Sequence, residues 1–225
     1  MIPRAIRAIA LLATLAVGVA CTTPGASLAP SDPATTSVAP SGTAPSGAAG
    51  GSCPTAEPAP LPAGETRTVT IETEQGTITL GLEGALSPIA VGNFVALAEC
   101  GFYDSVVFHR LVPGFVIQGG DPDGTGRGGP GYAISDDPLV GTYGRGTVAM
   151  ARTPAPDSQG SQFFIVLDDR ADSSLTQAEF PYAILGTVTA GMEVVDAIAA
   201  MPNSGEPANQ ALEPVAMTKV SVSNP

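Results

Sequence analysis

The sequence contains no tryptophan, only one histidine (His109), one lysine and three cysteines among its 225 residues. Having a single histidine and no CxxC pair, the chain lacks the ligand sets of structural zinc sites, so we expect no metal and no other cofactor. It also lacks a GxSxG segment of the kind that carries the nucleophile of many serine hydrolases. No apolar run reaches the roughly 20 residues that a membrane-spanning helix needs.

Positive charge is scarce as well. The chain carries 9 basic and 21 acidic residues. Removing Arg4 and Arg7, which lie near the N-terminus, leaves 7 basic against 21 acidic residues and a net charge of −14. Phosphate binding requires a basic face, so nucleic acid is not an expected partner. The acidic balance favours solubility instead.

Residues 1–20 have the pattern of a secretory signal peptide. Two arginines precede an apolar stretch over residues 8–19, and small residues stand directly before Cys21. The run GVAC resembles a lipoprotein signal, in which Cys21 becomes the lipid-modified first residue of the mature protein. An ordinary signal peptide cut near Ala20 is the alternative. The lipoprotein reading predicts an extracytoplasmic protein, tethered to the outer face of a bacterial cell membrane.

Residues 21–63 consist almost entirely of Pro, Ser, Thr, Ala and Gly. Such a segment buries too little apolar surface to offset its ordering entropy, so we expect a disordered tether. One folded domain is then expected over residues 64–225, a length that suits a single core. With Cys21 lipidated, Cys53 and Cys100 remain as a pair in an oxidising compartment. The sequence leaves open whether they form a disulfide or stay as two thiols.

The domain is expected to be mostly β. Residues 66–73 and 76–82 alternate apolar and polar side chains on either side of a short turn, as in a hairpin. Helical spacing and end signals mark two helices, from Ser87-Pro88 to Gly101 and from about Met192 to Met201. The remaining short apolar runs are VVFHRL, FVIQGG, GTVAMAR, QFFIVLD, YAILGTV and AMTKVSVS. This pattern predicts an eight-stranded antiparallel barrel capped by two α-helices.

One arginine and two glutamines lie among the apolar residues of these strands. Arg110 precedes Gln118 by eight residues, and Gln162 stands in a later strand. No nucleophile, metal ligand set or acid–base pair accompanies them. Rotation about an amide bond is a reaction that needs only a dry apolar pocket and a fixed hydrogen-bond donor. His109 beside Arg110 is an alternative catalytic group, but strand alternation would place it on the opposite face, into the barrel or its packing.

The segments FHRLVPGFVIQGGDPDGTG, GTVAMAR and GSQFFIVL resemble the signature segments of cyclophilins, the cyclosporin-binding class of peptidyl-prolyl cis-trans isomerases. The resemblance covers residues 66–223, in order and at matching spacing. It implies a barrel of eight strands with two helices, and catalysis of X–Pro isomerisation without a cofactor.

The resemblance also implies roles for individual residues. Arg110 stands at the position of the catalytic arginine, and Gln118 beside it would orient the guanidinium or contact the rotating carbonyl. Ser174 stands where many members have a tryptophan. The other matching positions are Phe115, Val116, Phe164, Leu175 and Tyr182 for the proline pocket; Gln162 and the backbone at Ala151 and Arg152 for holding the peptide; and Gly124 and Thr125 for a glycine-rich loop beside the groove.

Two functions fit these observations. The first is a peptidyl-prolyl cis-trans isomerase that assists the folding of exported proteins, acting as a monomer on proline-containing peptides and unfolded exported chains. The second is a cyclophilin-like module that binds proline-containing partners, or acts as a chaperone, with little turnover. The presence of Arg110 and Gln118 together with Phe115 and Phe164 favours the enzyme.

Overall fold

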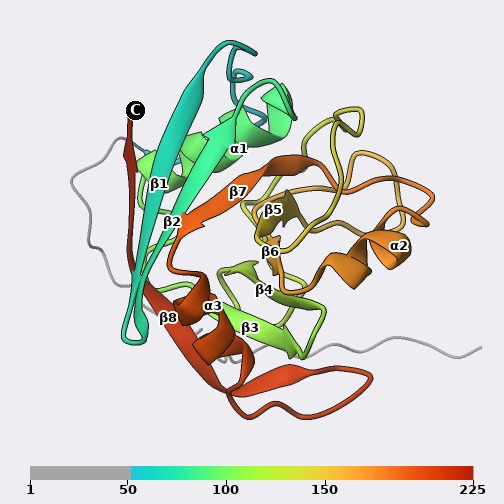
Figure 1. The fold of residues 1–225 in the computed structure, drawn as a ribbon. Coiled ribbons are helices and arrows are strands. Elements are labelled where there is room, and N and C mark those ends of the chain that lie inside the picture. Colours follow the sequence, from blue (N-terminus) through green and yellow to red (C-terminus); the bar gives the residue numbers. More distant parts are fainter. Residues whose placement is uncertain (1–51, 225) are drawn as a thin grey trace, which may run out of the picture. The chain divides into compact units, whose positions relative to one another are not determined.

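The computed structural model describes residues 52–224, so the predicted signal peptide, the lipidation site Cys21 and most of the predicted tether lie outside the described residues. Eight strands are present: β1 (Thr66–Thr73), β2 (Gly76–Glu83), β3 (Val107–Val112), β4 (Val116–Asp121), β5 (Thr147–Met150), β6 (Phe163–Val166), β7 (Ile184–Ala190) and β8 (Gln210–Ser223). They close into an antiparallel barrel in the order β1-β2-β7-β5-β6-β4-β3-β8 (Figure 1). The predicted eight-stranded barrel is confirmed.

Three helices accompany the barrel in this part of the chain. Helices α1 (Pro88–Glu99) and α3 (Met192–Ala199) are the two that periodicity predicted. The third, α2 (Asp172–Leu175), is a single turn that follows a 3-10 turn at Asp169–Ala171. The two predicted helices are confirmed, and α2 is an additional short one. Apolar periodicity could not indicate so short an element. The Asp168 carboxylate accepts the Arg170 N–H and caps the 3-10 turn that precedes α2.

Strand alternation divides the buried apolar side chains into two clusters. In β6, Phe163 and Ile165 belong to the larger cluster that fills the barrel, whereas Phe164 belongs to a smaller one. In β4, Ile117 joins the larger cluster and Val116 the smaller. Successive side chains of a strand point to opposite faces, so the smaller cluster lies on the outer face of the barrel. This outer face carries the candidate site.

The last part of the predicted tether packs against the barrel. Cys53 forms a disulfide with Cys100, which follows α1. Leu61 is buried within the larger cluster. Gly92 of α1 makes room for the segment, because a Cβ there would lie 2.4 Å from the Ala59 carbonyl oxygen. The folded part therefore begins upstream of residue 64, its predicted start. Composition could not locate this boundary, because only a few residues of the segment contact the barrel.

We expect the double variant Cys53→Ser/Cys100→Ser to lower the free energy of unfolding by about 2–4 kcal/mol, because the bridge restricts the unfolded chain. The two cysteines are 47 residues apart, so the constrained loop is long. Urea unfolding of the mature chain measures the effect, with the dithiothreitol-treated wild type as a second sample. Equal midpoints for all three proteins would contradict a stabilising bridge.

Candidate active site

Three polar side chains form a run of hydrogen bonds across the outer face of the barrel. Arg110 in β3 is paired with Gln118 in β4, and the Arg110 Nη1 donates to Gln118 Oε1 at 3.4 Å. Gln118 Nε2 donates to Gln162 Oε1 at 2.9 Å, and Gln162 Nε2 donates to the Gly128 carbonyl at 2.9 Å. Both amides are thus fixed in orientation at each end.

The guanidinium of Arg110 is held loosely by protein groups. Its long bond to Gln118 is the one side-chain hydrogen bond that it makes within residues 52–224. A guanidinium carries five N–H donors, so most of them remain available to a ligand. The side chain is half-buried at the edge of an apolar surface, where a charge-assisted hydrogen bond is stronger than in bulk water.

Beside Arg110 the smaller apolar cluster opens into a cavity of about 290 Å³, here called the proline pocket. Phe164 and Leu175 are almost fully buried in its wall, and the Tyr182 ring stands edge-on to Phe164 with centroids 5.3 Å apart. The lining residues are Arg110, Phe115, Val116, Gln118, Ala151, Arg152, Phe164, Ser174, Leu175 and Tyr182. The structure therefore brings together the predicted catalytic pair and the whole predicted pocket. Ser174, noted in the sequence only for its position, lines the pocket as well.

A larger cavity of about 550 Å³ shares Gln118, Ala151 and Arg152 with the proline pocket, so the two form one groove. Gln162 lies in its wall, as predicted for a residue that holds the peptide. The glycine-rich loop contributes residues 126–132 to this cavity. Neither Gly124 nor Thr125 lines any of these cavities, so the prediction placed the contact slightly too early in the loop.

Asp121 holds the glycine-rich loop in its conformation. Its buried carboxylate accepts hydrogen bonds from the backbone N–H groups of Gly126 (2.5 Å) and Arg127 (3.0 Å) and from Thr125 Oγ1 (3.3 Å). Thr125 is thereby directed at Asp121. Burial alone would raise the pKa of Asp121, but its backbone N–H donors lower it more, and the pKa ends below its ordinary value. The loop is thus wound around a buried anion.

His109 lies next to this loop and does not enter the barrel. The register pairs Phe108 with Gly119 and Arg110 with Gln118, so His109 is the extra residue of a bulge. Regular alternation predicted a ring that points into the barrel or its packing. The ring is buried but packs beside the loop, because alternation holds only where a strand is regular. The ring is buried near Gly126, and within residues 52–224 neither ring nitrogen has a hydrogen-bond partner. Burial lowers the pKa of His109, opposed by Asp121 and assisted by Arg110.

The Arg152 side chain is only 2% exposed, although the residue lines both cavities of the groove. Its Nη1 lies 2.8 Å from Asp136 Oδ1, and its guanidinium carbon lies 5.1 Å from the Phe180 ring centroid. It also donates to the carbonyls of Thr153, Ala155 and Pro181 at 3.3, 2.7 and 3.2 Å. Arg152 therefore ties together three connecting segments that border the groove. The predicted backbone position is in place, but sequence could not show this second role.

Tyr143 is a further supporting residue that sequence reasoning missed. It is fully buried, and its hydroxyl donates to the Tyr182 carbonyl at 2.9 Å and accepts the Tyr182 N–H at 3.0 Å. Burial raises the pKa of Tyr143 to about 12, so the hydroxyl stays protonated and can donate. Tyr143 thus fixes the backbone that carries one wall of the proline pocket. A lone tyrosine in a connecting segment carries no periodic signal.

The site thus combines a guanidinium with unbonded donors, an apolar cavity beside it and an adjoining groove. The family model described as "Cyclophilin type peptidyl-prolyl cis-trans isomerase/CLD" matches residues 68–222. The chain belongs to the cyclophilin family. It is thus a cyclophilin-type peptidyl-prolyl cis-trans isomerase, which confirms the resemblance seen in the signature segments.

Two curated relatives illustrate the similarity. The chain is 41% identical over 134 residues to peptidyl-prolyl cis-trans isomerase A of Dickeya dadantii (strain 3937), covering 58% of this chain and 70% of that protein. It is 37% identical over 175 residues to the probable peptidyl-prolyl cis-trans isomerase A of Mycobacterium leprae (strain TN), covering 69% of this chain and 92% of that protein.

Solved structures show the same fold. The crystal structure of a cyclophilin type peptidyl-prolyl cis-trans isomerase of Cryptosporidium parvum matches with a TM-score of 0.63 at 32% identity, covering 71% of this chain and 99% of that one. Another crystal structure of that protein, in the presence of the dipeptide Ala-Pro, matches with a TM-score of 0.62 at 30% identity.

Two kinds of feature are absent from residues 52–224. No group of three or more His, Cys, Asp or Glu side chains is arranged there to hold a metal ion. No helix in that part of the cyclophilin has the length and apolar character needed to cross a membrane.

We expect His109→Gln to keep most of the isomerase activity and to remove an acid-sensitive part of the stability. Burial holds the pKa of His109 below 6.5, so the unfolded chain binds a proton that the folded protein excludes. Stability from the neutral ring is complete above pH 6.5 and is lost as the pH falls below it. The wild type should lose up to about 1.4 kcal/mol per pH unit relative to the variant there.

Urea unfolding of both proteins at about pH 7.5, 6.5 and 5.5 measures this difference. Parallel loss of stability in the two proteins would contradict it. Because arginine stays charged, kcat/KM should be flat from about pH 6 to pH 8 in both proteins. An inflection in the wild type that disappears in His109→Gln would assign the catalytic role to the histidine.

Proposed function

We propose that this cyclophilin isomerises X–Pro bonds of exported proteins, with Arg110 as the catalytic group and Cys21 as a lipid anchor. One observation carries the catalytic part: a half-buried guanidinium with most donors unbonded stands at the edge of an apolar cavity. The Ala-Pro dipeptide present in one structure of the Cryptosporidium parvum cyclophilin supports proline-containing peptides as ligands.

The reaction needs little more than this arrangement. Amide resonance makes rotation about a peptide bond cost about 18–20 kcal/mol. As the bond twists, the prolyl nitrogen becomes pyramidal and gains a localised lone pair. A donor aimed at that nitrogen bonds the twisted state better than either planar state, and only such differential binding accelerates the reaction. No bond to the enzyme forms, and no proton has to be transferred.

Each part of the site then has a definite role. The rings of Phe115 and Phe164 and the Leu175 side chain enclose the proline ring and exclude water. The Arg110 guanidinium donates to the prolyl nitrogen, and Gln118 limits the directions that the guanidinium can adopt. Gln162 holds Gln118 and lines the adjoining part of the groove, where the peptide lies. These donors are oriented before the substrate binds, which reduces the reorganisation needed during rotation.

Three features support action outside the cytoplasm. The N-terminal 20 residues read as a signal peptide, and Cys21 follows a lipoprotein-like GVA. The disulfide between Cys53 and Cys100 belongs to the kind that persists in oxidising compartments. Newly exported chains are unfolded there and contain slowly exchanging X–Pro bonds, so a tethered isomerase would meet its substrates at the membrane surface.

Arg110→Ala should lower kcat/KM for a proline peptide by about tenfold to a hundredfold, because it removes a charge-assisted hydrogen bond worth about 1.5–3 kcal/mol. NMR exchange spectroscopy on a short X–Pro peptide measures the rate without a coupled protease. Arg170→Ala is the matched control, since Arg170 is exposed and bound to Asp168. Near-normal turnover by Arg110→Ala would defeat its assignment. Binding without turnover by the wild type would favour the chaperone function instead.

Cys21→Ala should move the protein from the membrane fraction to the soluble fraction of the producing cells, because the acyl chains attach to this residue. Globomycin-type inhibition of lipoprotein processing should leave the precursor uncleaved. Fractionation followed by immunoblotting measures both effects. The anchor would be disproved if Cys21→Ala partitioned into membranes like the wild type.

A further inference from the structure

A third cavity of about 250 Å³ adjoins the proline pocket and has no role in the isomerisation step described above. It shares Arg152 and Tyr182 with the proline pocket. Its remaining walls come from Thr153 and Pro154 and from the segment 178–180 that follows α2. A peptide bound with its proline in the pocket would therefore bring a neighbouring side chain to this third cavity, here called the side pocket.

The side pocket is not suited to an anionic group, although Arg152 lies in its wall. The ion pair with Asp136 balances the charge of the guanidinium. All three of its nitrogens already donate to carbonyls of the protein, namely those of Thr153, Ala155 and Pro181. Four of its five N–H groups already have acceptors within the protein, so the almost completely buried side chain offers an incoming anion at most one donor and no unbalanced charge.

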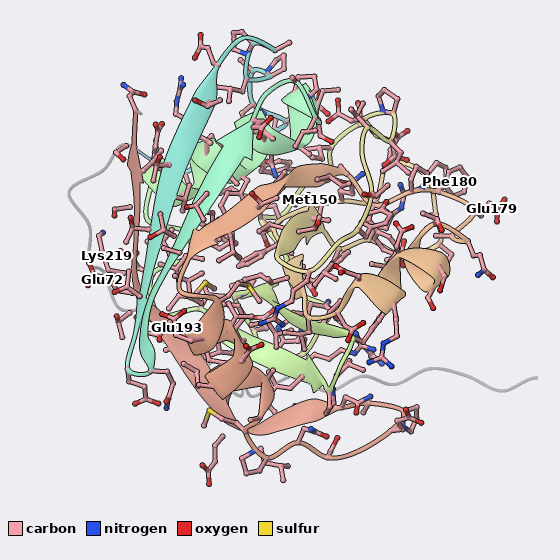
Figure 2. All side chains as sticks on the ribbon, viewed as in Figure 1. Glu72, Met150, Glu179, Phe180, Glu193 and Lys219 are labelled. Carbon is pink, nitrogen blue, oxygen red and sulfur yellow. A yellow bond between two sulfur atoms is a disulfide. The ribbon has the colours of Figure 1, made fainter. Side chains whose placement is uncertain are left out.

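Glu179 makes the side pocket suited to a cationic group. Among the described residues that line the three cavities, it supplies the only carboxylate. It is exposed, and within residues 52–224 it belongs to none of the salt bridges. Figure 2 shows Glu179 and its neighbour Phe180 in the loop beyond α2. Arg110 and Arg127 line the other two cavities, so a single acidic position stands at this end of the groove.

Phe180 completes the chemistry of the site. Its half-buried ring lies in the same wall and already has one cation, Arg152, over it. Aromatic rings accept cations over their faces, and the methylene stems of Lys and Arg pack on apolar surface while their charged ends stay in water. An aromatic wall with a carboxylate at an exposed position is thus complementary to a long basic side chain.

From this geometry we infer that the side pocket is a specificity subsite for a Lys or Arg side chain close to the bound proline, with Glu179 as the selecting residue. The inference rests on the isomerase function and adds a preference among its substrates. The attraction is between exposed charges, so it acts on KM more than on kcat, and salt weakens it.

The test uses the mature chain and a set of peptides around one Ala-Pro core. Lys, norleucine or Glu is placed in turn at each of the neighbouring positions, and NMR exchange gives kcat and KM. At one position the wild type should prefer Lys to norleucine by about two- to fivefold in kcat/KM, with Glu the poorest. The preference should shrink between about 0.02 and 0.5 M NaCl.

The variants then assign the preference to its residue. In Glu179→Gln the ratio of Lys to norleucine should fall to about one, and in Glu179→Lys the order of Lys and Glu should reverse. Glu193→Gln is the matched control, because it removes the same charge from an exposed residue of α3 on the opposite side of the molecule (Figure 2). Its preference for Lys should equal that of the wild type. Melting temperatures confirm that all three variants are folded.

Three results would overturn the inference: no Lys preference at any position, a preference that persists in Glu179→Gln, or an equal loss in Glu193→Gln. The last would mean that net charge, and not the side pocket, attracts basic peptides. Turnover of the unmodified Ala-Pro peptide separates this inference from the proposed function. If the wild type does not isomerise that peptide, the function fails; if it does so without a Lys preference, the side pocket alone fails.

Discussion

The site depends on the alternation of side chains along closed strands. Arg110, Gln118 and Phe164 each stand next to a residue of the larger core cluster, namely Leu111, Ile117 and Phe163. Because the two faces of a strand cannot move independently, packing inside the barrel fixes the positions of the groups outside it. The active surface therefore obtains its rigidity from the opposite side of the same strands, and few contacts on its own side are needed.

The connecting segments around the groove are held by a different device. These segments have no strand pairing, and buried polar groups with several partners hold them instead. Asp121 holds the glycine-rich loop, and Arg152 with Asp136 holds the segments next to β5 and β7. Tyr143 holds the backbone of Tyr182. Removing one member of such a network leaves the others buried without partners, which costs more than the lost bond itself. The groove thus combines a rigid sheet with loops that are fixed at a few points.

Sequence predicted what depends on regular repetition. The strands, the two longer helices and the grouping of Arg110 with Gln118 and the proline pocket follow from alternation and from the signature segments. The bulge at His109 could not be predicted, because a one-residue register shift leaves no mark in an apolar pattern. The orientation of Arg152 depends on its ion pair with Asp136, and the two residues come together only when the chain folds. The packed segment upstream of residue 64 depends on Leu61 and one disulfide within a sequence otherwise typical of a linker.

The disulfide between Cys53 and Cys100 also determines how the domain would carry a mechanical load. Tension applied through residues upstream of Cys53 would pass across the sulfur atoms directly to the end of α1. Residues 54–99, which include β1, β2 and α1, would be bypassed by that force. Without the bridge, the same tension would act on β1 and would tend to peel it from β2 and β8, its two neighbours in the barrel. The bond thus shields the barrel closure from pulling at the N-terminus.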